Sequence, residues 1–138
     1  MGRIVALDYG KKRTGIAVSD PLKLIANGLT ALPSKEILVF LKQYTKENQV
    51  ELFILGDPRQ MNYQPSENRE RVLRFRGDLQ RSFPNITIQM VDERFTSSMA
   101  HQAMIQGGLK KKDRQNKALV DKLSATILLQ SFLETNKA

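Results

Sequence analysis

The sequence contains no cysteine and only one histidine among its 138 residues. The absence of cysteine excludes disulfide bonds, thiolate metal sites and cysteine nucleophiles. No segment approaches the roughly 18 consecutive apolar residues that a membrane-spanning helix needs. Asp8 and Lys11-Lys12-Arg13 interrupt any apolar core of an N-terminal signal peptide. No internal repeat or low-complexity segment is found either. We therefore expect a cytoplasmic protein with no membrane partner, folded as one domain over residues 1–138.

The charge is strongly one-sided. Lysine and arginine number 22 against 14 acidic residues, which gives a net charge of +8. Such an excess raises the local concentration of phosphate polymers, although a merely solvated basic surface has the same composition. The candidate phosphate contacts are two clusters and an arginine beside an acidic pair: Lys11, Lys12 and Arg13; Lys110, Lys111 and Lys112; and Arg94. Arg94 could instead form a salt bridge with Asp92 or Asp57.

Apolar patterning predicts one mixed sheet flanked by helices. Three extended segments come first, followed by helices that alternate with two further strands. The predicted strands are 3–8, 15–19, 24–32, 52–55 and 86–91, and the predicted helices begin at caps Ser34, Ser66 and Thr96 and, for the last, at about 118. Three antiparallel strands followed by two strands reached through helical crossovers, and so parallel to the first, give an α/β fold with a five-stranded mixed sheet.

Acidic residues fall at the ends of the strands that this topology makes parallel. Asp8 ends the first apolar run, Asp57 follows the fourth strand, and Asp92-Glu93 ends the fifth. Open α/β sheets place their sites at the carboxyl ends of such strands. Aspartate at a strand end also begins turns and caps helices, so any one of these positions has an ordinary structural explanation. Their coincidence on one edge favours a site.

Asp121 is the most informative acid. At helical spacing it shares a face with Ala125, Leu128 and Phe132, where a carboxylate is costly unless it is paired or binds a metal. The structural alternative is an ion pair with lysine or arginine. Gathered carboxylates repel one another unless cations neutralise them. Oxygen ligands without cysteine point to Mg²⁺ or Mn²⁺ rather than zinc.

The chain resembles the YqgF-type family, also called RuvX, of Holliday-junction-resolvase-like proteins with an RNase H-like fold. The resemblance spans nearly the whole chain. It rests on four motifs in order: Leu7-Asp8-Tyr9-Gly10 with Gly15-Ile16-Ala17-Val18; Gly56-Asp57-Pro58; Asp92-Glu93-Arg94-Phe95-Thr96-Ser97; and the segment from Asp121 to Leu133. Members are described as candidate nucleases that process the end of pre-16S ribosomal RNA.

The resemblance implies a metal-dependent nuclease with catalytic and metal-binding residues Asp8, Glu93 and Asp121, and with Asp92 as a further metal ligand. Its partners would be pre-ribosomal RNA, with branched DNA or ribosomal particles as further possibilities. Two other hypotheses remain: a Holliday-junction resolvase, and a non-catalytic protein that binds nucleic acid or the ribosome. A kinase-like or chaperone-like fold ranks last, because it needs two such domains.

Overall fold

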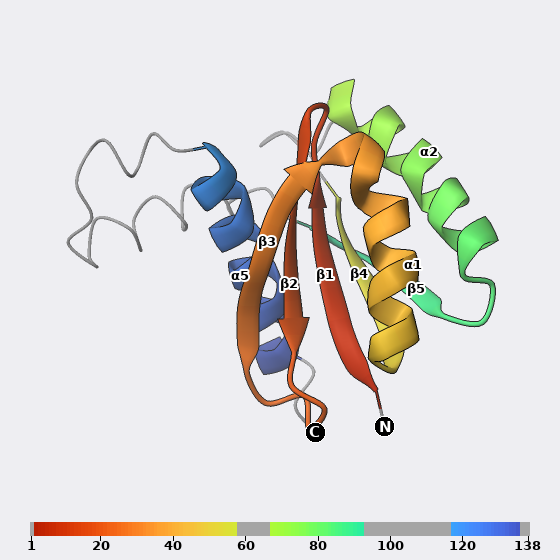
Figure 1. Ribbon diagram of the computed structural model, residues 1–138. Coiled ribbons are helices and arrows are strands. Elements are labelled where there is room, and N and C mark those ends of the chain that lie inside the picture. Colours follow the sequence, from red (N-terminus) through yellow and green to blue (C-terminus); the bar gives the residue numbers. More distant parts are fainter. Residues whose placement is uncertain (1, 58–66, 93–116, 136–138) are drawn as a thin grey trace.

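A twisted five-stranded sheet forms the centre of the molecule, with helices on both of its faces (Figure 1). The computed structural model describes residues 2–57, 67–92 and 117–135. Within them lie β1 (Arg3–Tyr9), β2 (Arg13–Ser19), β3 (Ala26–Pro33), the 3₁₀ turn η1 (Ser34–Glu36), α1 (Ile37–Glu47), β4 (Val50–Asp57), α2 (Glu67–Ser82), β5 (Thr87–Asp92) and α5 (Lys117–Thr135). No helix in this part of the chain is long and apolar enough to cross a membrane.

The strand order is β3-β2-β1-β4-β5, which confirms the predicted mixed sheet. β1 pairs with β2 in antiparallel fashion, and β2 pairs likewise with β3. β4 runs parallel to β1 on the other side, and β5 runs parallel to β4. The three parallel strands therefore end at one edge of the sheet, where Asp8, Asp57 and Asp92 occur.

Successive side chains of the central strand, β1, point to opposite faces of the sheet, as in any β-strand. Val5 and Leu7 belong to the core beneath α1 and α2. Ile4 and Ala6 belong to the core beneath α5. Both sets are buried, so β1 is covered on each side.

The core beneath α1 and α2 consists mainly of large side chains. In both helices the spacing of apolar residues predicts an inward face, and the structure confirms it: the buried residues are Ile37, Leu41, Val72, Phe75 and Leu79. The ring of Phe53 in β4 packs against Phe83, with centroids 5.2 Å apart.

The core beneath α5 is built differently, because the sheet offers small residues there. Ala6 and Ala17 are fully buried against the helix, whose own contact residues include Ala125. At Gly15 and Gly28 the contact is closer still. A Cβ atom on Gly28 would lie 2.7 Å from Thr126 Oγ1, and one on Gly15 would lie 2.0 Å from the carbonyl oxygen of Asp121.

The prediction that Ser34 caps a helix with its side chain is wrong. The segment opens with η1, whose N-cap is Pro33, and α1 begins only at Ile37. The Ser34 hydroxyl donates instead to the carbonyl oxygen of Gly10 at 2.6 Å and lies 2.8 Å from Thr14 Oγ1. Ser34 thus ties the β1–β2 turn to the end of β3, a long-range contact that local spacing does not reveal.

Smaller differences concern boundaries. The third strand begins at Ala26, because residues 20–25 form a turn around the Asp20 carboxylate. The spacing of Val72, Phe75, Leu79 and Phe83 predicts one inward helix face, but α2 ends at Ser82, so Phe83 lies beyond the helix. The caps expected at Ser66 and Thr96 lie outside the described residues.

Candidate active site

Asp8 and Asp121 come from opposite ends of the sequence and meet around Gly15. Asp8 lies opposite Gly15 in the β1–β2 register, so both residues face the same side of the sheet. The backbone of α5 at Asp121 approaches Gly15 so closely that no Cβ atom would fit between them. Glycine at this position therefore allows the helix to bring its carboxylate to the sheet.

Asp121 forms an ion pair with Arg13, the first residue of β2. The distance from Arg13 Nε to Asp121 Oδ2 is 3.1 Å, and the two side chains are 34% and 28% exposed. The structural alternative considered for Asp121 is therefore present in the molecule. The pair does not exclude a functional role, because a partly exposed ion pair can exchange its partners with ions from solvent.

Asp57 faces the opposite side of the sheet. It is buried, and its Oδ1 accepts a hydrogen bond from Arg69 Nε of α2 at 2.9 Å. Phe53 and Leu55, which share its side of β4, belong to the core beneath α1 and α2. Asp57 thus anchors α2 to the strand end, and it lies across the sheet from α5.

The start of α2 is also held against the end of β1. Asn68 Nδ2 donates to the carbonyl oxygen of Tyr9 at 3.0 Å. The Tyr9 ring stacks on Phe75, with centroids 4.2 Å apart and an interplanar angle of 11°. A tyrosine at this position could stack on a nucleic-acid base or pack within the protein. The stacking on Phe75 supports the second role for Tyr9. Burial raises the pKa of the Tyr9 phenol, opposed by the positive charges of Arg71 and Arg74.

The remaining predicted residues divide into two groups. Lys11 and Lys12 are exposed in the tight turn between β1 and β2, where Gly10 N donates to the carbonyl oxygen of Arg13 at 3.0 Å. The side chain of Asp92 lies outside the described part of the chain, as do Glu93, Arg94, Lys110, Lys111 and Lys112 in their entirety. The backbone of Asp92 is described, and it pairs in register with Asp57.

Sequence reasoning missed three features of this edge. Gly15 enters the sequence analysis only through a family motif, yet in the structure it sets the approach of α5. The Arg13–Asp121 and Asp57–Arg69 pairs join distant segments, and no local pattern predicts them. Glycine in the interior of a strand is the one available signal, since it often marks a close approach of another backbone.

The side chains available here carry carboxylate oxygens, the type of ligand that Mg²⁺ and Mn²⁺ prefer. Asp8 and Asp121 supply carboxylates on one side of the sheet, and no cysteine competes. One turn along α5, the buried hydroxyl of Ser124 has no hydrogen-bond partner, so a polar atom near Asp121 is unsatisfied. Within the described ranges no three acidic or histidine side chains form a metal-binding group. The third predicted ligand, Glu93, lies outside those ranges.

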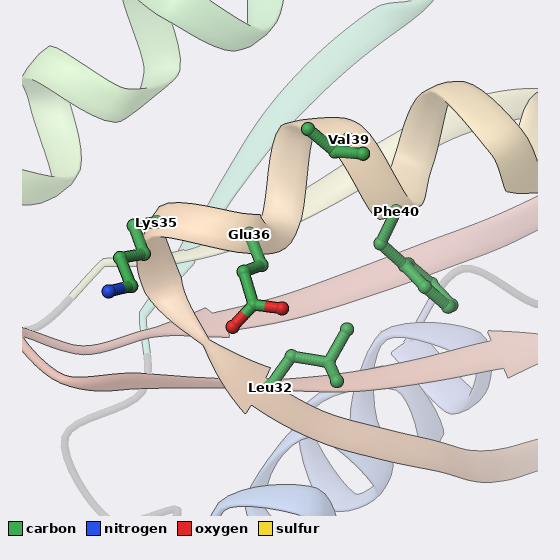
Figure 2. Close-up of a pocket in the computed structure, with 5 residues that line it drawn as sticks. All are labelled: Leu32, Lys35, Glu36, Val39 and Phe40. Carbon is green, nitrogen blue, oxygen red and sulfur yellow. The ribbon is translucent and has the colours of Figure 1, made fainter.

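A hollow elsewhere on the molecule takes no part in this arrangement. It has a volume of about 370 Å³ and is lined by Leu32, Lys35, Glu36, Val39 and Phe40. In Figure 2, Glu36 and Phe40 point from the η1–α1 segment toward Leu32 of β3. Its only carboxylate is that of Glu36, so it does not offer the paired acids of the sheet edge.

Comparison with known proteins identifies the family. A family model described as "RuvX: Holliday junction resolvase" matches residues 2–135. The chain belongs to the RuvX family. A RuvX relative from Phocaeicola vulgatus is 58% identical over 137 residues, covering 99% of both chains. One from Bacteroides fragilis is 56% identical over the same length and coverage. Both carry the name "Putative pre-16S rRNA nuclease".

Among solved structures, RuvC from T. thermophilus, in a complex with a Holliday junction substrate, has the same fold. The TM-score is 0.56, and the match covers 98% of this chain and 96% of that one. At 19% sequence identity the likeness concerns the fold alone. It confirms the predicted RNase H-like architecture of this RuvX protein.

Proposed function

We propose that this protein is a metal-dependent nuclease that hydrolyses phosphodiester bonds of pre-ribosomal RNA and matures the 5′ end of pre-16S rRNA. The observation that carries the proposal is the contact of Asp121 with Gly15, directly opposite Asp8. It supports a carboxylate pair at the edge of the sheet where parallel strands end. The names of the relatives support the choice of substrate.

In this proposal Asp8, Glu93 and Asp121 hold Mg²⁺ or Mn²⁺, with Asp92 as an additional ligand. Glu93 follows directly on β5, and Val91, two residues earlier, packs on the α5 side of the sheet. When bound there, divalent ions would supply Lewis-acid chemistry, namely activation of a water molecule and stabilisation of the leaving oxygen. The protein would position the carboxylates on rigid strands and on α5, while Lys11, Lys12 and the basic residues outside the described ranges contact phosphates.

Cleavage of a precursor RNA that spans the 5′ end of 16S rRNA, with Mg²⁺ or Mn²⁺, tests the proposal. Asp8→Asn, Glu93→Gln and Asp121→Asn should each abolish cleavage and weaken Mn²⁺ binding in calorimetric titrations. The apo proteins should stay folded, and Asp8→Asn and Glu93→Gln can gain stability because repulsion between the acids is relieved. Asp121→Asn also loses the partly exposed ion pair with Arg13, which is worth less than about 1 kcal/mol. Full turnover in any one variant would remove that residue from the site.

Asp20→Asn provides a matched control. Its carboxylate lies at the opposite end of β2, where Oδ1 accepts hydrogen bonds from the backbone of Leu24 at 2.8 Å and Ile25 at 2.7 Å. An amide oxygen can still accept both bonds. The one bond lost is that from the backbone of Leu22 to Oδ2, at 3.1 Å in an exposed turn, so this variant should still fold and cleave normally.

Two alternative functions, a junction resolvase and a non-catalytic binding protein, are tested in the same experiment. The description of the family model favours branched DNA, so a four-way DNA junction is offered beside the RNA. Faster cleavage of the junction would favour a resolvase. The Arg13–Asp121 ion pair favours a non-catalytic binding protein in which the acids are structural. RNA binding without cleavage, together with unfolding of Asp121→Asn, would support that function.

A further inference from the structure

Basic residues from two distant segments meet at the end of the sheet where the carboxylates lie. The β1–β2 turn and the first turns of α2 occupy the same end of the molecule (Figure 1). Lys11 and Lys12 are exposed on the turn. Arg74 is exposed on α2, and Arg71, three residues earlier on the same side of the helix, is half-buried.

A chain of contacts fixes these two segments to each other. Asn68 donates to the backbone of Tyr9, immediately before the turn, at 3.0 Å. Arg71 Nη1 in turn donates to Asn68 Oδ1 at 2.7 Å. The Tyr9–Phe75 stack holds the next turn of the helix against β1. The cations of α2 are therefore positioned relative to the turn by rigid contacts.

The arginines of this region differ in how their charge is balanced. Arg13, Arg69 and Arg81 each pair with a carboxylate. By contrast, Arg71 and Arg74 form no ion pair in the described part of the chain, and the bond of Arg71 is to a neutral amide.

We propose that Lys11, Lys12, Arg71 and Arg74 form a cationic ridge that binds the sugar–phosphate backbone of the RNA substrate beside the carboxylate edge. That the ligand of this ridge is RNA rests on the proposed function. Contacts of this kind fix register and orientation without reading sequence. The α2 arginines would extend the phosphate contacts beyond the turn and so align the strand with Asp8 and Asp121.

Salt-dependent binding of a short RNA duplex, measured without divalent metal, tests the ridge. Each phosphate contact contributes about 0.9 to the slope of log K against log salt concentration on a duplex. Arg71→Gln/Arg74→Gln should therefore flatten the slope by nearly two units, equally for two unrelated sequences. Arg74→Gln alone should flatten the slope by about half as much as the double variant. Because Arg74 is exposed, the single variant tests the ridge even if loss of the Arg71–Asn68 bond disturbs folding.

Two controls separate the ridge from general charge. Lys42→Gln/Lys46→Gln removes the same charge from exposed positions of α1, and Arg76→Gln removes one exposed charge from another side of α2. Neither should change the slope appreciably. Equal changes in the ridge and control variants would overturn the ridge and leave the nuclease proposal intact, provided that the wild-type protein binds and cleaves RNA. A wild-type protein that neither binds nor cleaves RNA would overturn both.

Discussion

The two faces of the sheet differ in the size of their residues, most clearly on β1 and β2. Beneath α1 and α2, large side chains such as Phe53, Leu55 and Phe75 interdigitate. Beneath α5, the sheet presents Gly15, Ala17 and other small residues, and the helix backbone approaches the strands directly. On the first face, bulky side chains separate the helices from the strands. On the other face, the backbone of α5 comes into direct contact with β2 at Gly15.

This difference explains why the candidate site lies on the α5 face. A carboxylate on a helix can reach a strand end only if the helix comes close, and Gly15 makes that possible at Asp121. On the opposite face Asp57 is the one buried acid among the residues that the structure describes; it pairs with Arg69 and serves as an anchor. We therefore expect changes in the buried core of the first face to lower stability and leave metal binding intact, and changes on the α5 face to alter metal binding as well.

The largest effect on stability is expected from Phe53→Ala. The side chain is fully buried and packs against Phe83, so the cavity should cost about 3–5 kcal/mol of unfolding free energy. Denaturant unfolding measures the loss. Below the transition the variant should bind Mn²⁺ as the wild-type protein does. Weakened Mn²⁺ binding in the folded variant would contradict the separation of the two faces.

Gly15→Ala should have the next largest effect, and it should lower both stability and Mn²⁺ affinity. The new Cβ atom would lie 2.0 Å from the Asp121 carbonyl oxygen and 2.4 Å from its carbon, and neither belongs to a flexible side chain. The start of α5 must move, at a cost of about 3 kcal/mol. Calorimetry should show weaker Mn²⁺ binding even at temperatures where the variant is folded.

Gly77→Ala in α2 is the control for that substitution. Its Cβ atom would meet only the flexible end of Arg81, at 3.3 Å. Alanine is the better helix former by about 1 kcal/mol, so this variant should be as stable as the wild-type protein or slightly more so. If both glycine variants behaved alike, close approach would not be the reason for Gly15.

The contrast between the faces also shows what the sequence could reveal. The five strands, their order and the buried positions Val72, Phe75 and Leu79 of α2 follow from local spacing, and the structure confirms them. Asp121 stands out because it interrupts an apolar helix face. Its partner Arg13 and its neighbour Gly15 lie more than a hundred positions earlier, so only the folded topology brings them together. The same holds for the bond between Ser34 and Gly10.

A smaller effect is expected from Arg13→Gln. The ion pair with Asp121 is partly exposed, so its loss should change stability by less than about 1 kcal/mol. Because Arg13 competes with metal for the same carboxylate, its removal should tighten Mn²⁺ binding, by less than about tenfold on the same energy scale. Arg76→Gln is the control for the change in net charge. Weaker Mn²⁺ binding in Arg13→Gln would instead show that Arg13 orients Asp121 for the metal.

The smallest effect concerns Tyr9, which adjoins Asp8 in sequence but packs on the opposite face, against Phe75. Burial raises the pKa of its phenol above the ordinary value of 10.0. The folded state thus favours the neutral phenol, a contribution that is complete below pH 10.0 and is lost as the pH rises through the folded pKa. Tyr9→Phe keeps the stacked ring, so unfolding at neutral pH should be unchanged and the alkaline loss of stability should be shallower. Part of that loss should remain, because burial also raises the pKa of Tyr44. Identical alkaline unfolding curves for the variant and the wild-type protein would mean that the Tyr9 phenol is solvated, and that the packing of the α1–α2 face ends before it reaches the end of β1.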